Sequence, residues 1–122
     1  MRIDPRTLAL AAATAAATLT PGTASATDED GARGRVIAVE VNTAGSSEHA
    51  SRHGAVTLRQ ANGNTVEYLW GGSTCPGQKL EANQIQMLVT AHLNRGKTWL
   101  TPTYTPSEGG DRRCLVKIRL SA

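Results

Sequence analysis

The chain contains no phenylalanine, and two tryptophans and two tyrosines supply all of its aromatic bulk. A core without phenylalanine has to be built from valine, leucine, isoleucine and alanine, with a few larger rings. A small domain of this kind buries little apolar surface and is only marginally stable without an additional constraint. The sequence therefore predicts one small domain that benefits from a covalent link.

Long hydrophobic runs are also missing. The longest apolar stretch, Leu8–Leu19, is mostly alanine, follows the basic residues Arg2 and Arg6, and precedes small residues at Ala24–Ala26. That order is typical of a secretory signal peptide, and the run is shorter than the ~20 apolar residues of a membrane span. We therefore predict a signal peptide over residues 1–26, no membrane span after its removal, and a secreted or periplasmic protein. A retained N-terminal anchor is the alternative.

The sequence has only a modest excess of positive charge, with a formal net charge of +3. Residues 1–26 contribute two arginines and one aspartate, so cleavage would lower that excess by one. Such a weak field does not predict nucleic-acid binding. The glycine-rich stretch Trp70–Gly77 lacks both the Lys-Ser/Thr pair and the Gly-x-Gly-x-x-Gly spacing of phosphate-binding loops. We predict no cofactor and a protein that is not an enzyme.

Cysteine occurs only twice, at Cys75 and Cys114. Two cysteines in an exported chain usually pair, and their wide separation does not form a redox Cys-x-x-Cys motif. The sequence therefore predicts a Cys75–Cys114 disulfide that ties the segment before the helix to the last strand.

The remaining residues divide into a tail and a domain. Residues 27–34 are polar and are expected to form a mobile mature N-terminus, and residues 35–122 form the domain. A first strand is expected over Arg35–Val41, with Ile37, Val39 and Val41 on one face. A long polar connection follows it.

The clearest local signal is a hairpin around Ala61-Asn62-Gly63. A two-residue turn would place Leu58 opposite Glu67, whereas a three-residue loop with a left-handed Gly63 places Leu58 opposite Val66. Register follows the buried face, so we predict the three-residue loop. It gathers the large side chains of both strands into one apolar wall, made of Val56, Leu58, Val66, Tyr68 and Trp70.

A helix is expected over Leu80–Arg95, closed by Gly96 at the C′ position. Its apolar stripe consists of Ala82, Ile85, Leu88, Val89, His92 and Leu93. The next strand, Lys97–Thr105, contains Pro102, which predicts either an edge strand or a bulged strand. The last strand, Arg113–Leu120, alternates between two faces. Cys114, Val116, Ile118 and Leu120 lie on one face, and Leu115, Lys117 and Arg119 lie on the other.

The predicted fold is mainly β with one α-helix, in the order β-β-β-α-β-β. That order favours a small OB-like barrel, with an open α+β sheet covered by one helix as the alternative. Over Arg35–Leu120 the order of elements resembles the OB-fold binding (B) subunits of bacterial AB5 toxins, which are also exported and carry a single disulfide. The resemblance implies a ring-forming glycan binder. It carries over no sugar-contacting residue, and it is compatible with a homo-oligomer.

Three groups of residues are candidates for function. Aromatic rings form stacking platforms for ligands, so Trp99, Tyr104 and Trp70 are candidate ligand contacts. Trp70, on the apolar wall, is expected mainly to supply core bulk, whereas Trp99 and Tyr104 can equally serve either role. Lys117 and Arg119 are candidate partner contacts. His49 and His53, four residues apart, could share a metal, but no third ligand has matching spacing, so we predict no metal site. His92, within the helix stripe, is expected to be packed.

These observations favour a secreted, non-enzymatic binding module for an unknown glycan or protein ligand. The alternative is a small exported inhibitor or accessory protein that acts on another protein through its basic last strand. A small hydrolase or metal enzyme is the third hypothesis, because Glu48 accompanies the histidines in the loop.

Overall fold

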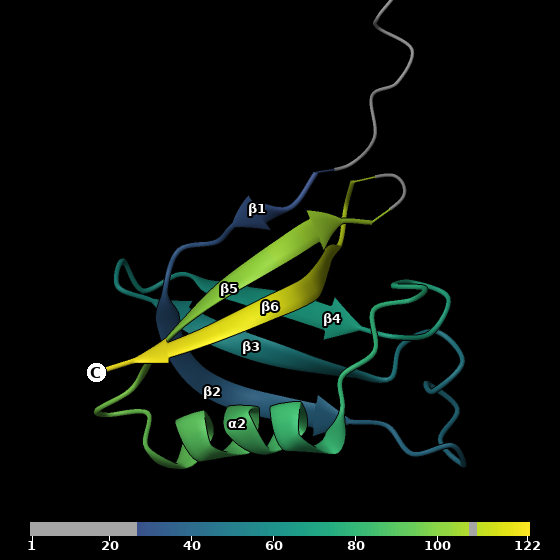
Figure 1. The fold of residues 1–122 in the computed structure, drawn as a ribbon, viewed down its shortest axis with the longest axis horizontal. Helices are drawn as coiled ribbons and strands as arrows, with labels where there is room; N and C mark the ends of the chain where they lie inside the picture. The colour runs from purple at the N-terminus through teal and green to yellow at the C-terminus, as the bar shows by residue number, and fades with distance from the viewer. Residues whose placement is uncertain (1–26, 108–109) are drawn as a thin grey trace, which may run out of the picture.

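The computed structural model describes residues 27–107 and 110–122, which form six strands and one helix (Figure 1). The predicted signal peptide, residues 1–26, lies outside the described residues. The elements in chain order are β1 (Glu29–Asp30), β2 (Gly34–Val41), β3 (Gly54–Gln60), β4 (Thr65–Trp70), α2 (Ala82–Leu93), β5 (Trp99–Pro106) and β6 (Arg113–Ser121).

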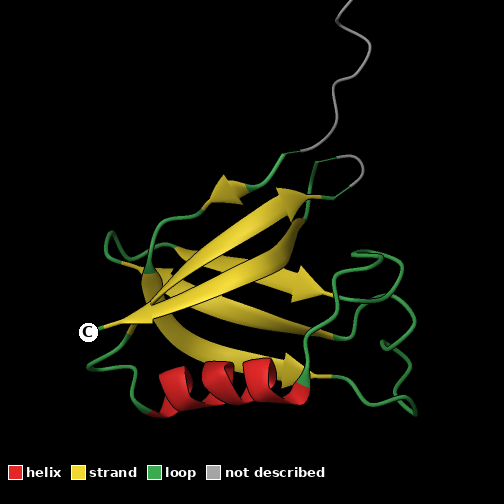
Figure 2. Cartoon of the chain, viewed as in Figure 1, coloured by secondary structure: helices red, strands yellow, loops and turns green. Residues whose placement is uncertain are grey.

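The strands β2 to β6 close into a small barrel, and α2 covers one end of it (Figure 2). Neighbouring strands pair in the order β5-β2-β3-β4-β6, and β6 pairs back onto β5. The closing pair of β4 with β6 is parallel, at Leu69 and Cys114, and all other pairs are antiparallel. This confirms the predicted OB-like barrel and excludes the open sheet.

The hairpin between β3 and β4 has the predicted register. Val56 lies opposite Tyr68, and Leu58 lies opposite Val66. Gly63 has a φ of 92°, which only glycine adopts readily, and its amide donates to the carbonyl of Gln60. The three-residue loop is therefore confirmed, because this register alone buries the apolar face of both strands.

The first long strand, β2, departs from the predicted alternation. A bulge lies between Val36 and Ala38, so Ile37 has no partner on β3. Val36 is fully buried and Val39 packs against the core, while Val41 is 51% exposed. The predicted common face of Ile37, Val39 and Val41 is therefore wrong, because one extra residue reverses the faces on either side of it.

The last strand, β6, carries a second bulge. Thr103 pairs with Lys117 and Tyr104 pairs with Leu115, which leaves Val116 unpaired. Leu115 is buried in the core with Ile118 and Leu120 packed nearby, so its predicted outward position is wrong. Lys117 and Arg119 are exposed as predicted. Strand β5 pairs on both sides, and the extra residue of the bulge lies on β6, so neither the edge strand nor the bulged strand predicted from Pro102 is correct.

The helix is shorter than predicted. It begins at Ala82, where the amide of Glu81 donates to the side-chain oxygen of Gln84 at 2.7 Å, and it ends at the cap residue Asn94. Gly96 therefore does not close it. Leu88 and Ala91 form its buried face, whereas Leu93 is 72% exposed, so the predicted stripe is wrong at its C-terminal end.

His92 belongs to the contact between α2 and β2. It is half-buried, and its Nδ1 donates to the carbonyl oxygen of Val36 at 3.0 Å. This contact ties α2 to β2 next to the bulge in the β2–β3 ladder. The predicted packed role of His92 is confirmed.

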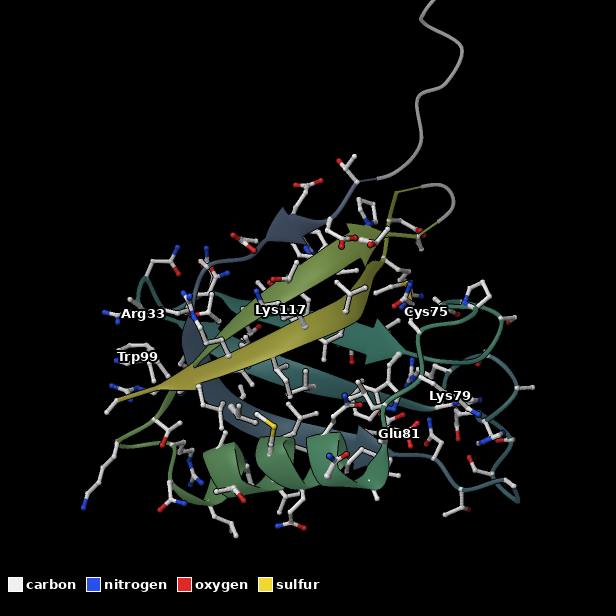
Figure 3. The ribbon with its side chains drawn as sticks, in the orientation of Figure 1. Arg33, Cys75, Lys79, Glu81, Trp99 and Lys117 are labelled. Atoms are coloured by element: carbon white, nitrogen blue, oxygen red, sulfur yellow. A yellow bond between two sulfur atoms is a disulfide. The ribbon has the colours of Figure 1, made fainter. Side chains whose placement is uncertain are left out.

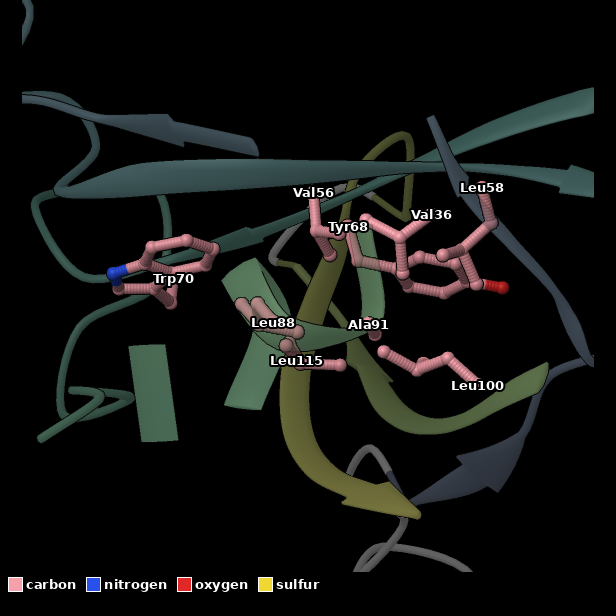
Figure 4. Packing of buried hydrophobic residues seen from close by; sticks show 9 residues of the cluster. All are labelled: Val36, Val56, Leu58, Tyr68, Trp70, Leu88, Ala91, Leu100 and Leu115. Carbon is pink, nitrogen blue, oxygen red and sulfur yellow. The ribbon is translucent and has the colours of Figure 1, made fainter. Parts of the chain in front are cut away.

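The core gathers side chains from all five barrel strands and from α2 (Figure 4). Tyr68 and Trp70 are its largest fully buried members, and they supply the bulk that phenylalanine provides in other domains. The buried cluster consists of Val36, Val56, Leu58, Tyr68, Trp70, Leu88, Ala91, Leu100 and Leu115.

The predicted disulfide between Cys75 and Cys114 is present and spans 39 residues of sequence. Both cysteines are buried in a second small cluster with Ala55 and Leu69, on the other side of the sheet from the main core. The segment Gly71–Gly77 turns here with three glycines of positive φ. Because the disulfide joins this turn to the first residues of β6, it closes the barrel covalently where β4 and β6 share only one pair.

Candidate functional site

Two arginines stack on Trp99 at the start of β5. The guanidinium carbon of Arg35 lies 3.5 Å from the centre of the indole ring, and that of Arg33 lies 4.4 Å from it. Figure 3 shows Arg33 and Trp99 side by side at one end of the barrel. Such cation–π contacts are favourable and hold flexible arginine side chains in place.

Backbone geometry explains this arrangement. Gly34 is buried between the two arginines, and it pairs with Gln60 of β3 and with Leu100 of β5. A Cβ atom at Gly34 would lie 2.8 Å from the carbonyl oxygen of Arg59. The absence of a side chain therefore lets β2 enter between β3 and β5. Because Val36 and Leu100 point inward, their neighbours Arg35 and Trp99 point outward and meet.

The same outer surface continues onto β6. Lys117 pairs with Thr103 and Arg119 pairs with Thr101, and these four side chains line a shallow hollow of about 50 Å³ together with Asp30. On the other side, Arg59 of β3 pairs with Arg35. We call this surface the basic face; it consists of Arg33, Arg35, Arg59, Trp99, Thr101, Thr103, Lys117 and Arg119.

The cations of the basic face have no carboxylate partner. Within residues 27–107 and 110–122, the only ion pair joins Arg52 to Glu40 at 3.0 Å, in a different part of the molecule. The hydrogen bonds that Arg52 and Asn42 donate hold the pKa of Glu40 below its usual value. In contrast, Nη1 of Arg35 is enclosed and has no hydrogen-bond partner in the described structure. Within the described residues, the cations of the basic face therefore form no ion pair, although Asp30 lines the hollow beside Lys117 and Arg119.

An acidic strand borders the basic face. Residues 27–34 were expected to be a mobile tail, but Glu29 and Asp30 form β1 and pair with Tyr104 and Thr103 of β5. Side chains reinforce the pairing: Thr103 donates its hydroxyl to Asp30, Tyr104 to Glu29, and Thr105 to Asp28. In the structure these residues dock on β5, because hydroxyls far away in the sequence bind their carboxylates.

The structure does not bring the three candidate aromatic residues together. Trp99 is half-buried and points outward, whereas Tyr104 packs against the core and lies 5.5 Å from Tyr68 between ring centres. Trp70 is 1% exposed and offers no surface to a ligand. Of the three, only Trp99 lies on the basic face, where it meets the second predicted group, Lys117 and Arg119.

Sequence reasoning missed the arginines of this site. Arg33 was assigned to the tail, and Arg35 and Arg59 were not considered as contacts. The signal that could have found Arg59 is its position next to Leu58 in the predicted hairpin, which places it on the wet face. No local pattern predicted that Trp99 would lie against Arg33 and Arg35, because this contact joins residues far apart in the sequence.

The histidine loop provides a contact but no metal cluster. His49 and His53 stack with their ring centres 4.3 Å apart. No group of three or more histidine, cysteine, aspartate or glutamate side chains in the described part of the chain is arranged to hold a metal ion. A groove of about 220 Å³ lies between α2 and β6 and is lined mainly by apolar side chains.

Comparisons with known proteins do not assign the site. Neither a protein-family model, nor a curated protein, nor a solved structure matches the chain. None of the helices among the described residues is long and apolar enough to cross a membrane. The disulfide is typical of oxidising compartments and fits an extracellular or periplasmic location.

Proposed function

We propose that this chain is a secreted or periplasmic, non-enzymatic binding module, and that the basic face holds its glycan or protein ligand. One observation carries the proposal: two arginines are stacked on an outward-facing tryptophan, on the same face as Lys117 and Arg119, and none of these cations forms an ion pair within the described residues. Aromatic and arginine side chains dominate the energetics of binding surfaces. Arginines already fixed on a ring lose less conformational freedom when a ligand binds.

The barrel supports this role by its rigidity. Trp99, Arg35 and Arg119 lie on strands rather than on loops, so their backbone positions are set by the sheet. The fold alone does not assign a function, because OB-like barrels serve many. The proposal therefore rests on the side chains of the basic face.

Tryptophan fluorescence tests whether the basic face binds anything. Titration with panels of neutral glycans, charged glycans and peptides is expected to find a ligand that changes the emission, because Trp99 is partly exposed on the proposed site. In a Trp99→Phe variant the remaining fluorophore is the buried Trp70, so the same ligand should leave the emission unchanged. A change that persists in that variant, or no change with any ligand, would count against the proposal.

A further inference from the structure

We infer that the ligand of the basic face is an anionic polysaccharide, bound by guanidinium and ammonium groups, while Trp99 positions Arg33 and Arg35. This inference rests on the proposed binding function and specifies its ligand class. Four features of the basic face support it. Guanidinium groups cover the indole ring, the cations form no ion pair within the described residues, the cations extend over several strands, and the surface does not suit other polyanions.

The first feature is the covered ring of Trp99. A neutral sugar or a nucleobase would bind by stacking on the indole, but the guanidinium groups of Arg33 and Arg35 already stack there. Apart from the enclosed Nη1 of Arg35, the hydrogen-bond donors on their edges remain the groups that a ligand can meet. Guanidinium edges bind carboxylate and sulfate groups through paired hydrogen bonds.

The second feature is the positive charge of Arg33 and Arg35. Because the two guanidinium carbons lie 3.5 Å and 4.4 Å from one ring centre, they are less than about 8 Å apart and repel each other. No carboxylate within the described residues pairs with either of them. A ligand anion that contacts both would relieve this repulsion, which a neutral ligand cannot do.

The third feature is the distance over which the cations of the basic face are spread. Lys117 and Arg119 are two residues apart on β6, so they are separated by about 7 Å along the strand. Around the outside of the barrel, the cations continue from β6 past β5 and β2 to Arg59 on β3. The hollow on this face between β5 and β6 holds about 50 Å³, which is too small to enclose a compact ligand. An extended chain with repeated negative charges fits this distribution.

The fourth feature is the poor match of the basic face to nucleic acids and membrane surfaces. The stacking position that a nucleobase would need on Trp99 is occupied by guanidinium groups. A membrane surface would favour apolar side chains beside the cations, but the exposed large apolar residues, Val41, Met87 and Leu93, lie on the end of β2 and on α2. Instead, the cations flank Thr101 and Thr103, whose hydroxyls can bond to sugar hydroxyls.

The acidic strand β1 limits the direction in which a polyanion can run across the basic face. Asp30 lines the hollow next to Lys117 and Arg119, and it accepts a hydrogen bond from Thr103. A polyanion that extended along β1 would meet its carboxylates. The chain should therefore cross from β6 over the start of β5 to Arg35 and Arg59, away from β1.

The test uses the full-length secreted protein and calorimetric titration with heparin, polygalacturonate, dextran, double-stranded DNA and vesicles rich in phosphatidylglycerol. Heparin or polygalacturonate should bind, with an affinity that falls steeply between 50 and 300 mM salt, roughly as counterion release predicts. The double variants Arg33→Gln with Arg35→Gln and Lys117→Gln with Arg119→Gln should each weaken binding by about tenfold or more. The matched control, Arg95→Gln with Lys97→Gln, removes two exposed cations elsewhere and should bind as the unmodified protein does.

A separate pair of variants tests the positioning role of Trp99. Trp99→Leu keeps every cation but removes the ring, and it should weaken polyanion binding several-fold, whereas Trp99→Phe should restore most of the affinity. Equal affinity of Trp99→Leu and the unmodified protein would overturn this role. Thermal melting of each variant separates loss of binding from loss of folding.

The outcomes distinguish the ligand class from the binding function. Binding of dextran as tight as that of heparin, or tighter binding of DNA or vesicles, would overturn the polysaccharide inference but leave a binding face in place. An equal loss of affinity in the Arg95/Lys97 control would also overturn it, because net charge alone would then explain binding. Absence of binding to every probe, together with unchanged Trp99 emission throughout the fluorescence panels, would overturn both proposals.

Discussion

Replacing both cysteines, as Cys75→Ala with Cys114→Ala, is expected to lower the free energy of unfolding by about 4 kcal/mol. The disulfide closes a segment of 39 residues, and in the chain-entropy model a loop of this length restricts the unfolded state by about that amount. Thermal denaturation should show a fall of roughly 20 °C in Tm for a domain of this size. The effect is large because the core is small and the free energy of unfolding of such domains is only about 5–15 kcal/mol.

Reductant provides the control for this experiment. It should lower the Tm of the unmodified protein to nearly that of the double alanine variant, and it should leave the variant unchanged. Both cysteines are almost fully buried, so the variant also loses packing around Ala55 and Leu69. Two free thiols in protein purified under oxidising conditions would contradict the structure, and an unchanged Tm would contradict the stabilising role.

The second large effect is expected at Trp70. Trp70→Ala should lower the free energy of unfolding by about 3–5 kcal/mol, because the side chain is 1% exposed and its removal leaves a cavity in a core that has no phenylalanine. Urea denaturation followed by circular dichroism measures this change. Trp99→Ala is the matched control: it removes an equal ring from a half-buried surface position and should cost much less.

The two tryptophans should also differ in their effect on ligand binding. Trp70→Phe keeps most of the buried volume, so the variant should fold and bind the ligand of the basic face with unchanged affinity. Equal losses of stability at Trp70 and Trp99 would show that the core is not where the structure places it. A loss of binding in folded Trp70→Phe would assign Trp70 a contact role that its burial does not support.

The barrel could be predicted because its signals are local. The hairpin register followed from which residues of β3 and β4 are apolar, and the pairing of Cys75 with Cys114 followed from their number. The order of elements around a single helix then favoured a closed barrel over an open sheet. Each of these inferences needed only neighbouring residues or a simple count.

The two bulges could not be predicted in the same way. Val36, Ile37, Val39 and Val41 are all apolar, so either face of β2 could be buried, and the pattern does not mark the extra residue. The same holds for Leu115 and Val116 in β6. Closing a small barrel requires strong local twist, which bulges provide, and that demand comes from the whole barrel rather than from either strand.

The basic face required long-range information. Trp99 and Tyr104 differ by an odd number of residues, so they point to opposite sides of β5, and this could have been noticed from the sequence. The docking of β1 could not be noticed from the sequence, because Thr103, Tyr104 and Thr105 bind carboxylates more than seventy residues away. Without β1 and the entry of β2 beside β5, nothing placed Arg33 and Arg35 on Trp99.

Chemical-shift mapping tests the location of the binding face most directly. Labelled protein is titrated with a sulfated heparin oligosaccharide, and the amide and indole N–H signals are followed. The structure predicts that the largest changes occur at the Trp99 indole and at residues 33–35, 101–103 and 117–119. Changes confined to the histidine loop, to the groove between α2 and β6, or to the turn at Gly71–Gly77 would contradict a binding site on the basic face.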